Sequence, residues 1–163
     1  VGARQRGPRH VTTFCDASAI VKRYVDEPGR EHVVGLEERL VVSDLSVVEV
    51  PCAIWRKHRA GELSAPDASV LVSAFDYDLR GGTYQPPRYA AVQLRPEVLA
   101  RAAALLPRHD LRTGDAIQLA SAVAARASLE FCDTFATFDR RLRSAAVAEG
   151  FALLPSETDM ETL

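Results

Sequence analysis

Short apolar runs alternate with amphipathic stretches along this chain. The runs VTTFC (11–15) and LVVS (40–43) are almost wholly apolar, as expected of buried strands. Between such runs, apolar residues recur every three or four positions, as in SVVEVPCAIWRKHRAG (46–61), which predicts helices. The predicted strands are 11–15, 40–43, 89–94, 129–137 and 151–155. The predicted helices are 18–26, 31–39, 46–61, 64–79, 96–109, 113–127 and 139–150.

This alternation predicts an α/β fold with a parallel sheet and helices on both of its faces. In such sheets, functional groups collect at the carboxyl ends of the strands, near the point where the strand order reverses. The length of 163 residues fits one domain, which we place at 11–155. We expect a disordered arm or cloning remnant at 1–10 and a frayed acidic tail at 156–163. The Gly- and Pro-rich segment 81–88 is predicted to be a loop, and its role stays open.

Composition narrows the class of protein. With 47% hydrophobic and 26% charged residues, the chain has the balance of a globular domain, and no apolar run approaches the length of a membrane span. A net charge of −2 is unlike that of proteins that bind nucleic acid through a strongly basic surface. Nearly all basic residues are arginines, which suit bidentate phosphate contacts, although biased coding and solvated surface explain the same composition. We interpret Cys15, Cys52 and Cys132 as small buried hydrophobic residues in a reducing cytoplasm, because no pair has zinc-ligand spacing.

Several familiar sites are excluded by the sequence. No glycine-rich phosphate loop follows the first strand, and the four histidines lack the spacing of zinc ligands. There is no nucleophile elbow and no convincing Ser/His/Asp order. A phospho-accepting receiver domain needs an acidic pair after its first strand and a lysine late in the chain. The last lysine here is Lys57, so this class is excluded as well.

Four acids stand at junctions between predicted elements. Asp16 follows the first strand, Glu49 lies near the start of a helix, and Asp115 and Asp139 open two later helices. Desolvating several carboxylates together is unfavourable because burial and mutual repulsion add, and a divalent cation with oxygen ligands would relieve both. The sequence is therefore consistent with a metal site formed by these four acids.

Helix capping explains the same residues one at a time. Asp16, Asp115 and Asp139 lie near helix N-termini, where acids are favoured, and Glu49 lies three residues after Ser46, as in a capping box. Two further acids compete for places in the cluster, namely Asp44, which we interpret as a cap, and Asp133, which by alternation shares a face with Phe131 and Phe135. Three hydroxyls stand near the proposed acids and are candidates to orient a carboxylate or a metal-bound water, namely Ser18, Ser43 and Thr137.

Four blocks of the sequence resemble the PIN-domain family, particularly the VapC-type toxins of bacterial toxin–antitoxin pairs. They are FCDASAIVKRYVDEPG, VVSDLSVVEVPCAIWR, LRTGDAIQLASA and FATFDRRLRSAAVAEGF, and they occur in family order. The resemblance covers residues 11–154, nearly the whole chain. The resemblance implies a three-layer α/β/α sandwich with a central, mainly parallel sheet. It also implies a Mg²⁺- or Mn²⁺-dependent endoribonuclease that forms a homodimer and is held inactive by a cognate VapB-like antitoxin.

Matched residue by residue, the resemblance assigns the metal-binding and catalytic acids to Asp16, Glu49, Asp115 and Asp139. Thr137 matches the hydroxyl two residues before the last acid, and all four acidic positions are filled. The hypothesis is metal-assisted hydrolysis of RNA phosphodiester bonds in the cytoplasm, with one or two ions and with either Asp115 or Asp139 as proton acceptor. Candidates for contact with RNA phosphates are Arg112, Arg140 and Arg141, for which a solvated surface role is the alternative. The alternative for the whole chain is a catalytically silent PIN-like binding or scaffold subunit.

Overall fold

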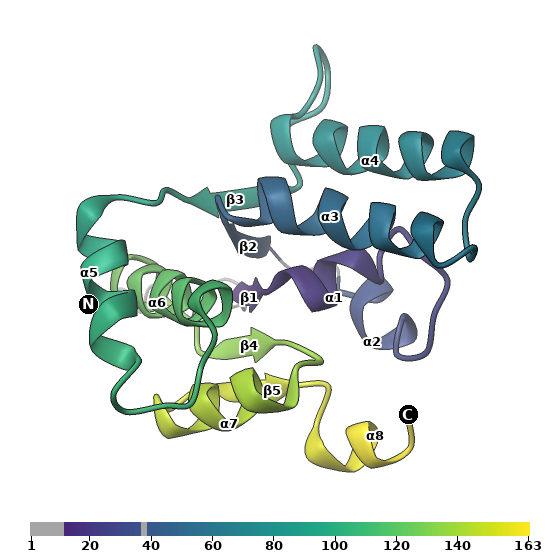
Figure 1. Ribbon diagram of the computed structural model, residues 1–163. Helices are drawn as coiled ribbons and strands as arrows, with labels where there is room; N and C mark the ends of the chain where they lie inside the picture. The colour runs from purple at the N-terminus through teal and green to yellow at the C-terminus, as the bar shows by residue number, and fades with distance from the viewer. Residues whose placement is uncertain (1–11, 37–38) are drawn as a thin grey trace, which may run out of the picture.

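A five-stranded parallel sheet forms the centre of the molecule. The computed structural model describes residues 12–36 and 39–163, and its strands lie in the order β3-β2-β1-β4-β5 (Figure 1). The strands are β1 (Thr12–Cys15), β2 (Arg39–Ser43), β3 (Tyr89–Val92), β4 (Thr134–Ala136) and β5 (Ala152–Leu154). The helices are α1 (Ala17–Val21), α2 (Glu31–Val34), α3 (Ser46–Arg59), α4 (Ala65–Arg80), α5 (Pro96–Leu105), α6 (Thr113–Ser128), α7 (Arg140–Ala148) and α8 (Glu157–Glu161).

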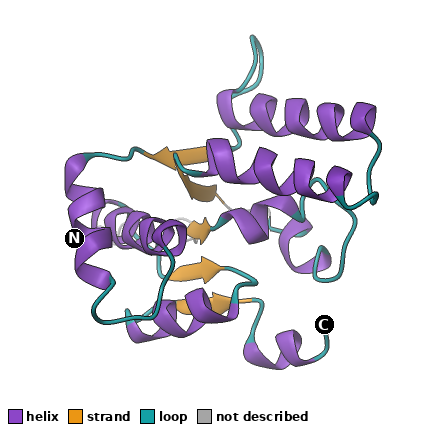
Figure 2. Ribbon diagram, in the orientation of Figure 1, coloured by secondary structure: helices purple, strands orange, loops and turns teal. Residues whose placement is uncertain are grey.

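Helices cover both faces of this sheet, as Figure 2 shows. Side chains alternate across each strand, so Phe14 and Val41 point into a core built with α5, α6 and α7. Leu40 and Val42 point into the opposite core, which is built with α1 to α4. The predicted α/β/α sandwich is therefore confirmed, and the apolar strand sequences follow from burial on both faces.

The strand order reverses between β1 and β4, which is the point where the chain changes the direction in which it adds strands to the sheet. The chain runs outward from β1 through β2 to β3, then returns to β4 on the other side of β1. The helices that follow β1 and β4 start at the same edge of the sheet, where the structure brings Asp16 and Thr137 together. Any site at the strand reversal is thus built from the residues that directly follow these two strands.

Several of the predicted helices and strands were too long. The helix predicted at 31–39 ends at Val34, and the strand predicted at 129–137 begins only at Thr134. Phe131 has a positive φ of 62°, which a strand does not accommodate, so the alternation that placed Asp133 beside Phe131 does not exist. Within the described residues, no helix is long and apolar enough to cross a membrane.

The acidic tail forms a short helix where we predicted fraying. Ser156 and Asp159 close a capping box at the start of α8, which satisfies backbone groups that a frayed end leaves to water. The predicted arm at 1–10 and the first residue of the predicted strand 11–15 lie outside the described residues.

Arg143 on α7 holds the tail and the strand ends together. Its buried guanidinium donates from Nη1 to the carbonyl of Thr137 at 3.0 Å and from Nη2 to the carbonyl of Pro155 at 2.9 Å. Nη2 also donates to Glu157 at 2.8 Å, at the start of α8. One side chain therefore joins the ends of β4 and β5 and fixes the segment that carries Thr137.

Replacing Arg143 by methionine keeps the packing volume but leaves two buried carbonyls without a donor. We expect the free energy of unfolding to fall by about 2–4 kcal/mol, measured by urea denaturation with circular dichroism. Arg101→Met, at an exposed position on α5, is the matched control and should change this energy by less than about 0.5 kcal/mol. Equal effects of the two substitutions would contradict a structural role for Arg143.

Candidate metal centre

The carboxylate of Asp16 is buried where β1 passes into α1. It is 4% exposed, caps α1 by accepting from the backbone N–H of Ala19 at 2.9 Å, and accepts from the hydroxyl of Ser18 at 2.7 Å. Its second oxygen accepts from the Thr137 hydroxyl at 2.8 Å. Burial raises the pKa of Asp16 to about 6 in spite of these hydrogen bonds, and the charge of Glu49 adds to the rise. The predicted capping role is confirmed, but the capping hydrogen bond does not return the pKa of this carboxylate to its ordinary value.

Glu49 faces this carboxylate from the first turn of α3. Its side chain accepts from Nε2 of Gln118 at 2.7 Å. Burial raises the pKa of Glu49, and the charge of Asp115 contributes to the rise. A Cβ at Gly114 would stand 2.7 Å from Oε1 of Glu49, so this glycine leaves the space that the carboxylate occupies.

Asp115 and Asp139 complete the group from the first turn of α6 and the N-cap of α7. Burial raises the pKa of Asp115, and the charge of Asp139 raises it further. The positive charges of Arg112 and Arg141 lower the pKa of Asp115 and so oppose this rise. Asp139 caps α7 by accepting from the backbone N–H groups of Arg141 at 2.8 Å and Leu142 at 3.0 Å.

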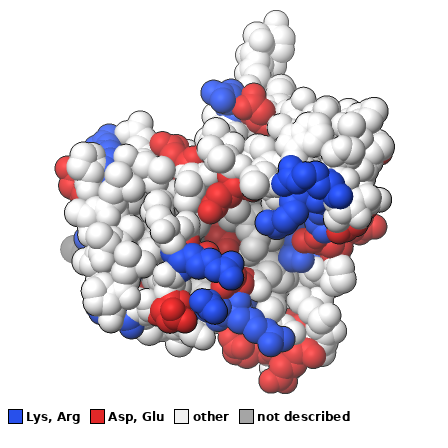
Figure 3. Space-filling model, viewed as in Figure 1, with Lys and Arg blue, Asp and Glu red and all other residues white. Residues whose placement is uncertain are grey.

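These four acids, which we call the four-acid cluster, line one cleft of about 890 Å³. In Figure 3, acidic side chains gather in the centre of the face, with basic side chains to the lower left and, on the right, over the C-terminal half of α3. The other residues that line the cleft come chiefly from α1, α3 and the start of α6, and include Ser18, Lys22, Glu27, Cys52, Ala53, Arg56, Lys57, Arg112, Gly114, Gln118 and Phe138. Residues distant in sequence thus surround one opening.

The four-acid cluster has the chemistry of a site for a hard divalent cation. As the side chains stand, no three His, Cys, Asp or Glu residues in 12–36 and 39–163 converge closely enough to enclose an ion. The acids nevertheless interact electrostatically from one to the next. The charge of Glu49 raises the pKa of Asp16, that of Asp115 raises the pKa of Glu49, and that of Asp139 raises the pKa of Asp115. An all-oxygen set with excess negative charge fits Mg²⁺ or Mn²⁺, which would offset the repulsion.

The other predicted residues divide into those near the cluster and those away from it. Ser18 and Thr137 both donate to Asp16, and Arg112 lines the cleft. Ser43 is fully buried and accepts from the Ser121 hydroxyl at 2.9 Å, so it does not touch the cluster. Arg140 and Arg141 are absent from the residues that line the cleft, and both are exposed.

The capping box predicted for the helix of Glu49 is wrong. The N-cap of α3 is Leu45, which makes no side-chain capping bond, and Ser46 is the first helical residue. The rivals of the four acids are not part of the cleft either, since neither Asp44 nor Asp133 lines it. The expectation for Cys52 fails too, because this residue is exposed and lines the cleft.

Gln118 and Gly114 support the site and were missed by the sequence analysis. Gln118 is 2% exposed and donates to Glu49, and its own Oε1 is buried without a partner among the described residues. A polar amide three residues after Asp115, on one face of the most apolar helix, is a signal that the sequence does contain. The space that Gly114 provides for Glu49 depends on contact between α3 and α6 and leaves no such signal.

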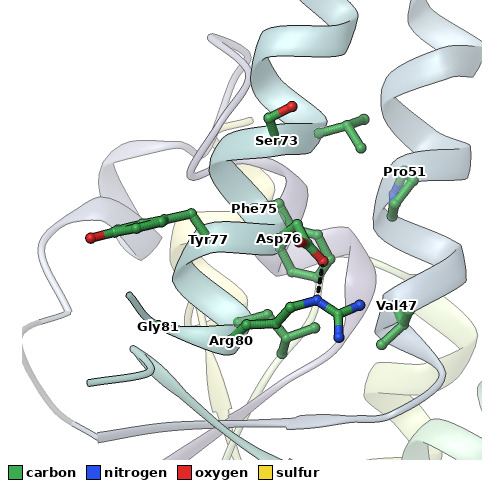
Figure 4. A pocket seen from close by; sticks show the side chains of 10 residues that line it. Val47, Pro51, Ser73, Phe75, Asp76, Tyr77, Arg80 and Gly81 are labelled. Atoms are coloured by element: carbon green, nitrogen blue, oxygen red, sulfur yellow. Dashed lines mark hydrogen bonds and ion pairs between the residues drawn. The ribbon is translucent and has the colours of Figure 1, made fainter. Parts of the chain in front are cut away.

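A second hollow, of about 600 Å³, lies between α3 and α4 (Figure 4). Val47 and Pro51 line it from α3, and Phe75 is among the α4 residues on the other side. Its one carboxylate, Asp76, is paired with Arg80 at 2.6 Å. With its single acid already neutralised, this hollow offers no group of ligands for a cation.

Removal of the Asp16 charge should stabilise the metal-free protein above neutral pH. The pKa of Asp16 is about 6 in the folded state, compared with 3.8 for an unperturbed aspartate. The ionisation cost is therefore absent below about pH 4, grows between about pH 4 and pH 6, and stays at about 3 kcal/mol above pH 6. We expect Asp16→Asn, which retains a capping oxygen, to match the wild type near pH 4 and to exceed its unfolding free energy at pH 8 in chelator.

Urea denaturation of both proteins across this pH range measures the difference. If Asp16→Asn is destabilised equally at both ends of the range, the carboxylate serves as a structural cap and its burial carries no electrostatic cost.

The sequence matches the model of the PIN domain family over residues 13–148. No curated protein matches the chain. Among solved structures, the crystal structure of PAE2754 from Pyrobaculum aerophilum is similar, with a TM-score of 0.61 and 20% sequence identity over 96% of this chain and 97% of that one. At this identity the likeness supports the fold alone. Because the family match spans most of the chain and includes all four acids, the chain belongs to the PIN-domain family.

Proposed function

We propose that this chain is a divalent-metal-dependent endoribonuclease and the toxin of a toxin–antitoxin pair. PIN domains are usually metal-dependent nucleases. The observation that carries the proposal is the four-acid cluster, in which carboxylates from four separate elements line one cleft and raise one another's pKa in sequence. Buried like charges are destabilising, so their retention around an open cleft supports a functional role.

The four acids would hold one or two Mg²⁺ or Mn²⁺ ions. When bound, such ions activate water and neutralise charge on the phosphate that is attacked. The chain itself orients the ligands, since Ser18 and Thr137 set the rotation of the Asp16 carboxylate and Gln118 holds that of Glu49. Asp115 and Asp139 are the candidates to accept a proton from the attacking water.

Arg112 is the predicted arginine best placed to meet the RNA backbone. It is the N-cap of α6, is exposed, lines the cleft and lowers the pKa of Asp115 by its charge. Arg141 lies 3.5 Å from Asp110, which offsets part of its charge. We expect Arg112 to bind a phosphate next to the bond that is cut.

The partners follow from the same charges. The cleft is negative until cations bind, so an antitoxin could block it with an arginine or lysine side chain. The predicted homodimer would cover apolar surface, and exposed apolar side chains are available on α3 (Val47 and Val48) and on α4 (Val70 and Tyr77). A scaffold subunit would need neither metal nor RNA, and a Mn²⁺ titration separates that alternative from the nuclease.

Cleavage of RNA should require both the metal and the four-acid cluster. We expect purified protein to cleave structured RNAs with Mn²⁺ or Mg²⁺ and to lose this activity in EDTA. Asp115→Asn should lower the rate by about 100-fold or more because a proposed metal ligand is lost. Asp44→Asn, which changes an acid outside the cleft, is the matched control and should keep the rate. Cleavage that persists in EDTA, or in an Asp16→Asn, Asp115→Asn double variant, would refute the proposal.

Gly114→Ala should separate metal binding from stability. The new Cβ would displace the Glu49 carboxylate, whose oxygen would otherwise lie 2.7 Å away. We expect Mn²⁺ affinity, measured by titration calorimetry, to fall by about 10-fold. The unfolding free energy should stay equal or rise by up to about 1 kcal/mol, because alanine favours the helix.

Gly35→Ala is the control, since its nearest neighbour would be an ordinary 3.7 Å contact. Unchanged Mn²⁺ affinity in Gly114→Ala would show that the position of the Glu49 carboxylate does not matter for the ion.

A further inference from the structure

The cleft continues along α3 beyond the four-acid cluster. Glu49, Cys52, Ala53 and Arg56 all line it from this helix. Their spacing of three, four and seven residues places them on one face, with Arg56 about 10 Å along the axis from Glu49. The side chains between Glu49 and Arg56 are small, so the α3 side of the cleft, which we call the α3 wall, leaves room for an extended ligand along the helix.

Two lysines at the same end of the cleft are already neutralised. Lys22 and Lys57 both bind Glu27, at 2.9 Å and 2.6 Å, and Lys57 also binds Glu62 at 3.0 Å. Hydrogen bonds from both lysines keep the pKa of Glu27 lowered although burial opposes this. Two cations and two anions cancel, so this network attaches the segment after α1 to α3 and contributes little net charge to the cleft.

Arg56 is the cation on the α3 wall that remains unbalanced. It is exposed, and within residues 12–36 and 39–163 no acidic side chain pairs with it. Basic side chains are visible over this part of α3 beside the acidic centre in Figure 3. A guanidinium with free donors at the end of an acidic cleft is suited to bidentate binding of a phosphate.

We infer that Arg56 binds a backbone phosphate of the RNA strand whose scissile bond lies at the four-acid cluster, so that the strand runs along α3. This inference rests on the proposed nuclease function and extends it, because it adds a contact remote from the bond that is cut. At 3.4 Å per nucleotide in a stacked strand, about 10 Å corresponds to about three nucleotides. Arg112, at the start of α6, lines the same cleft, so Arg56 and Arg112 together would bind two phosphates of the substrate.

The alternative for Arg56 is an ordinary surface role. It is one of four basic residues at the C-terminal end of α3, where the helix dipole stabilises positive charge. In that case its loss would change stability slightly and leave RNA binding unaffected. The two roles therefore differ in how RNA affinity depends on salt, since each phosphate contact contributes a defined slope.

The test measures binding of a fluorescent single-stranded RNA by anisotropy between about 50 and 300 mM NaCl, in an Asp115→Asn background that does not cut it. Arg56→Gln should reduce the slope of log affinity against log salt by about 0.7 and lower affinity at low salt by about three- to tenfold. Arg56→Lys should keep the slope because the charge is retained. The matched control Arg101→Gln, at an exposed position on α5, should change neither quantity.

In the active protein, Arg56→Gln should raise KM and leave kcat within about twofold, because the contact is made equally in the bound and transition states. If Arg56→Gln and Arg101→Gln give the same slope and KM while cleavage still requires metal, the inference is wrong and the nuclease stands. If the wild type neither binds nor cleaves RNA with Mn²⁺, the proposed function fails and the inference fails with it.

Discussion

The burial of one carboxylate at the strand reversal is the constraint on which the site depends. Asp16 loses its hydration there, and the loss is only partly offset by Ser18, Ala19 and Thr137. Because Thr137 follows β4, these bonds join two strands far apart in sequence at the edge where their helices diverge. The backbone carbonyl of Thr137 also accepts a hydrogen bond from Arg143. Thr137 therefore connects the buried Asp16 carboxylate to α7.

The remaining acids extend this unfavourable arrangement across the cleft. Each carboxylate raises the pKa of the next, and the hydrogen bonds that each receives orient it without removing the repulsion. Gln118 and Gly114 are informative because neither is acidic, yet one holds Glu49 in place and the other leaves room for it. A chain selected for stability alone would gain from neutral side chains at such positions, which is why the cluster supports a bound cation.

Much of the architecture was predictable from local pattern, and the errors have local causes. The α/β/α sandwich and the caps at Asp16 and Asp139 were predicted, because alternation and capping are properties of a few consecutive residues. The capping box at Ser46 failed because Ser46 is already the first helical residue of α3 and Leu45 is the N-cap. The strand before Thr134 failed because the positive φ of Phe131 interrupts an otherwise alternating sequence.

The sequence by itself determined which residue types end the strands, that helices cover both faces, and, through its resemblance to PIN domains, which four acids to consider. It did not determine whether those acids share a cleft, nor that Ser43 lies apart from them while Gln118 and Arg56 belong to the same opening. The physical reason is that strand order, and the angle at which α3 meets α6, depend on packing between distant segments. Local periodicity carries no information on that packing, so only the tertiary structure decided which charged groups meet and which are already neutralised.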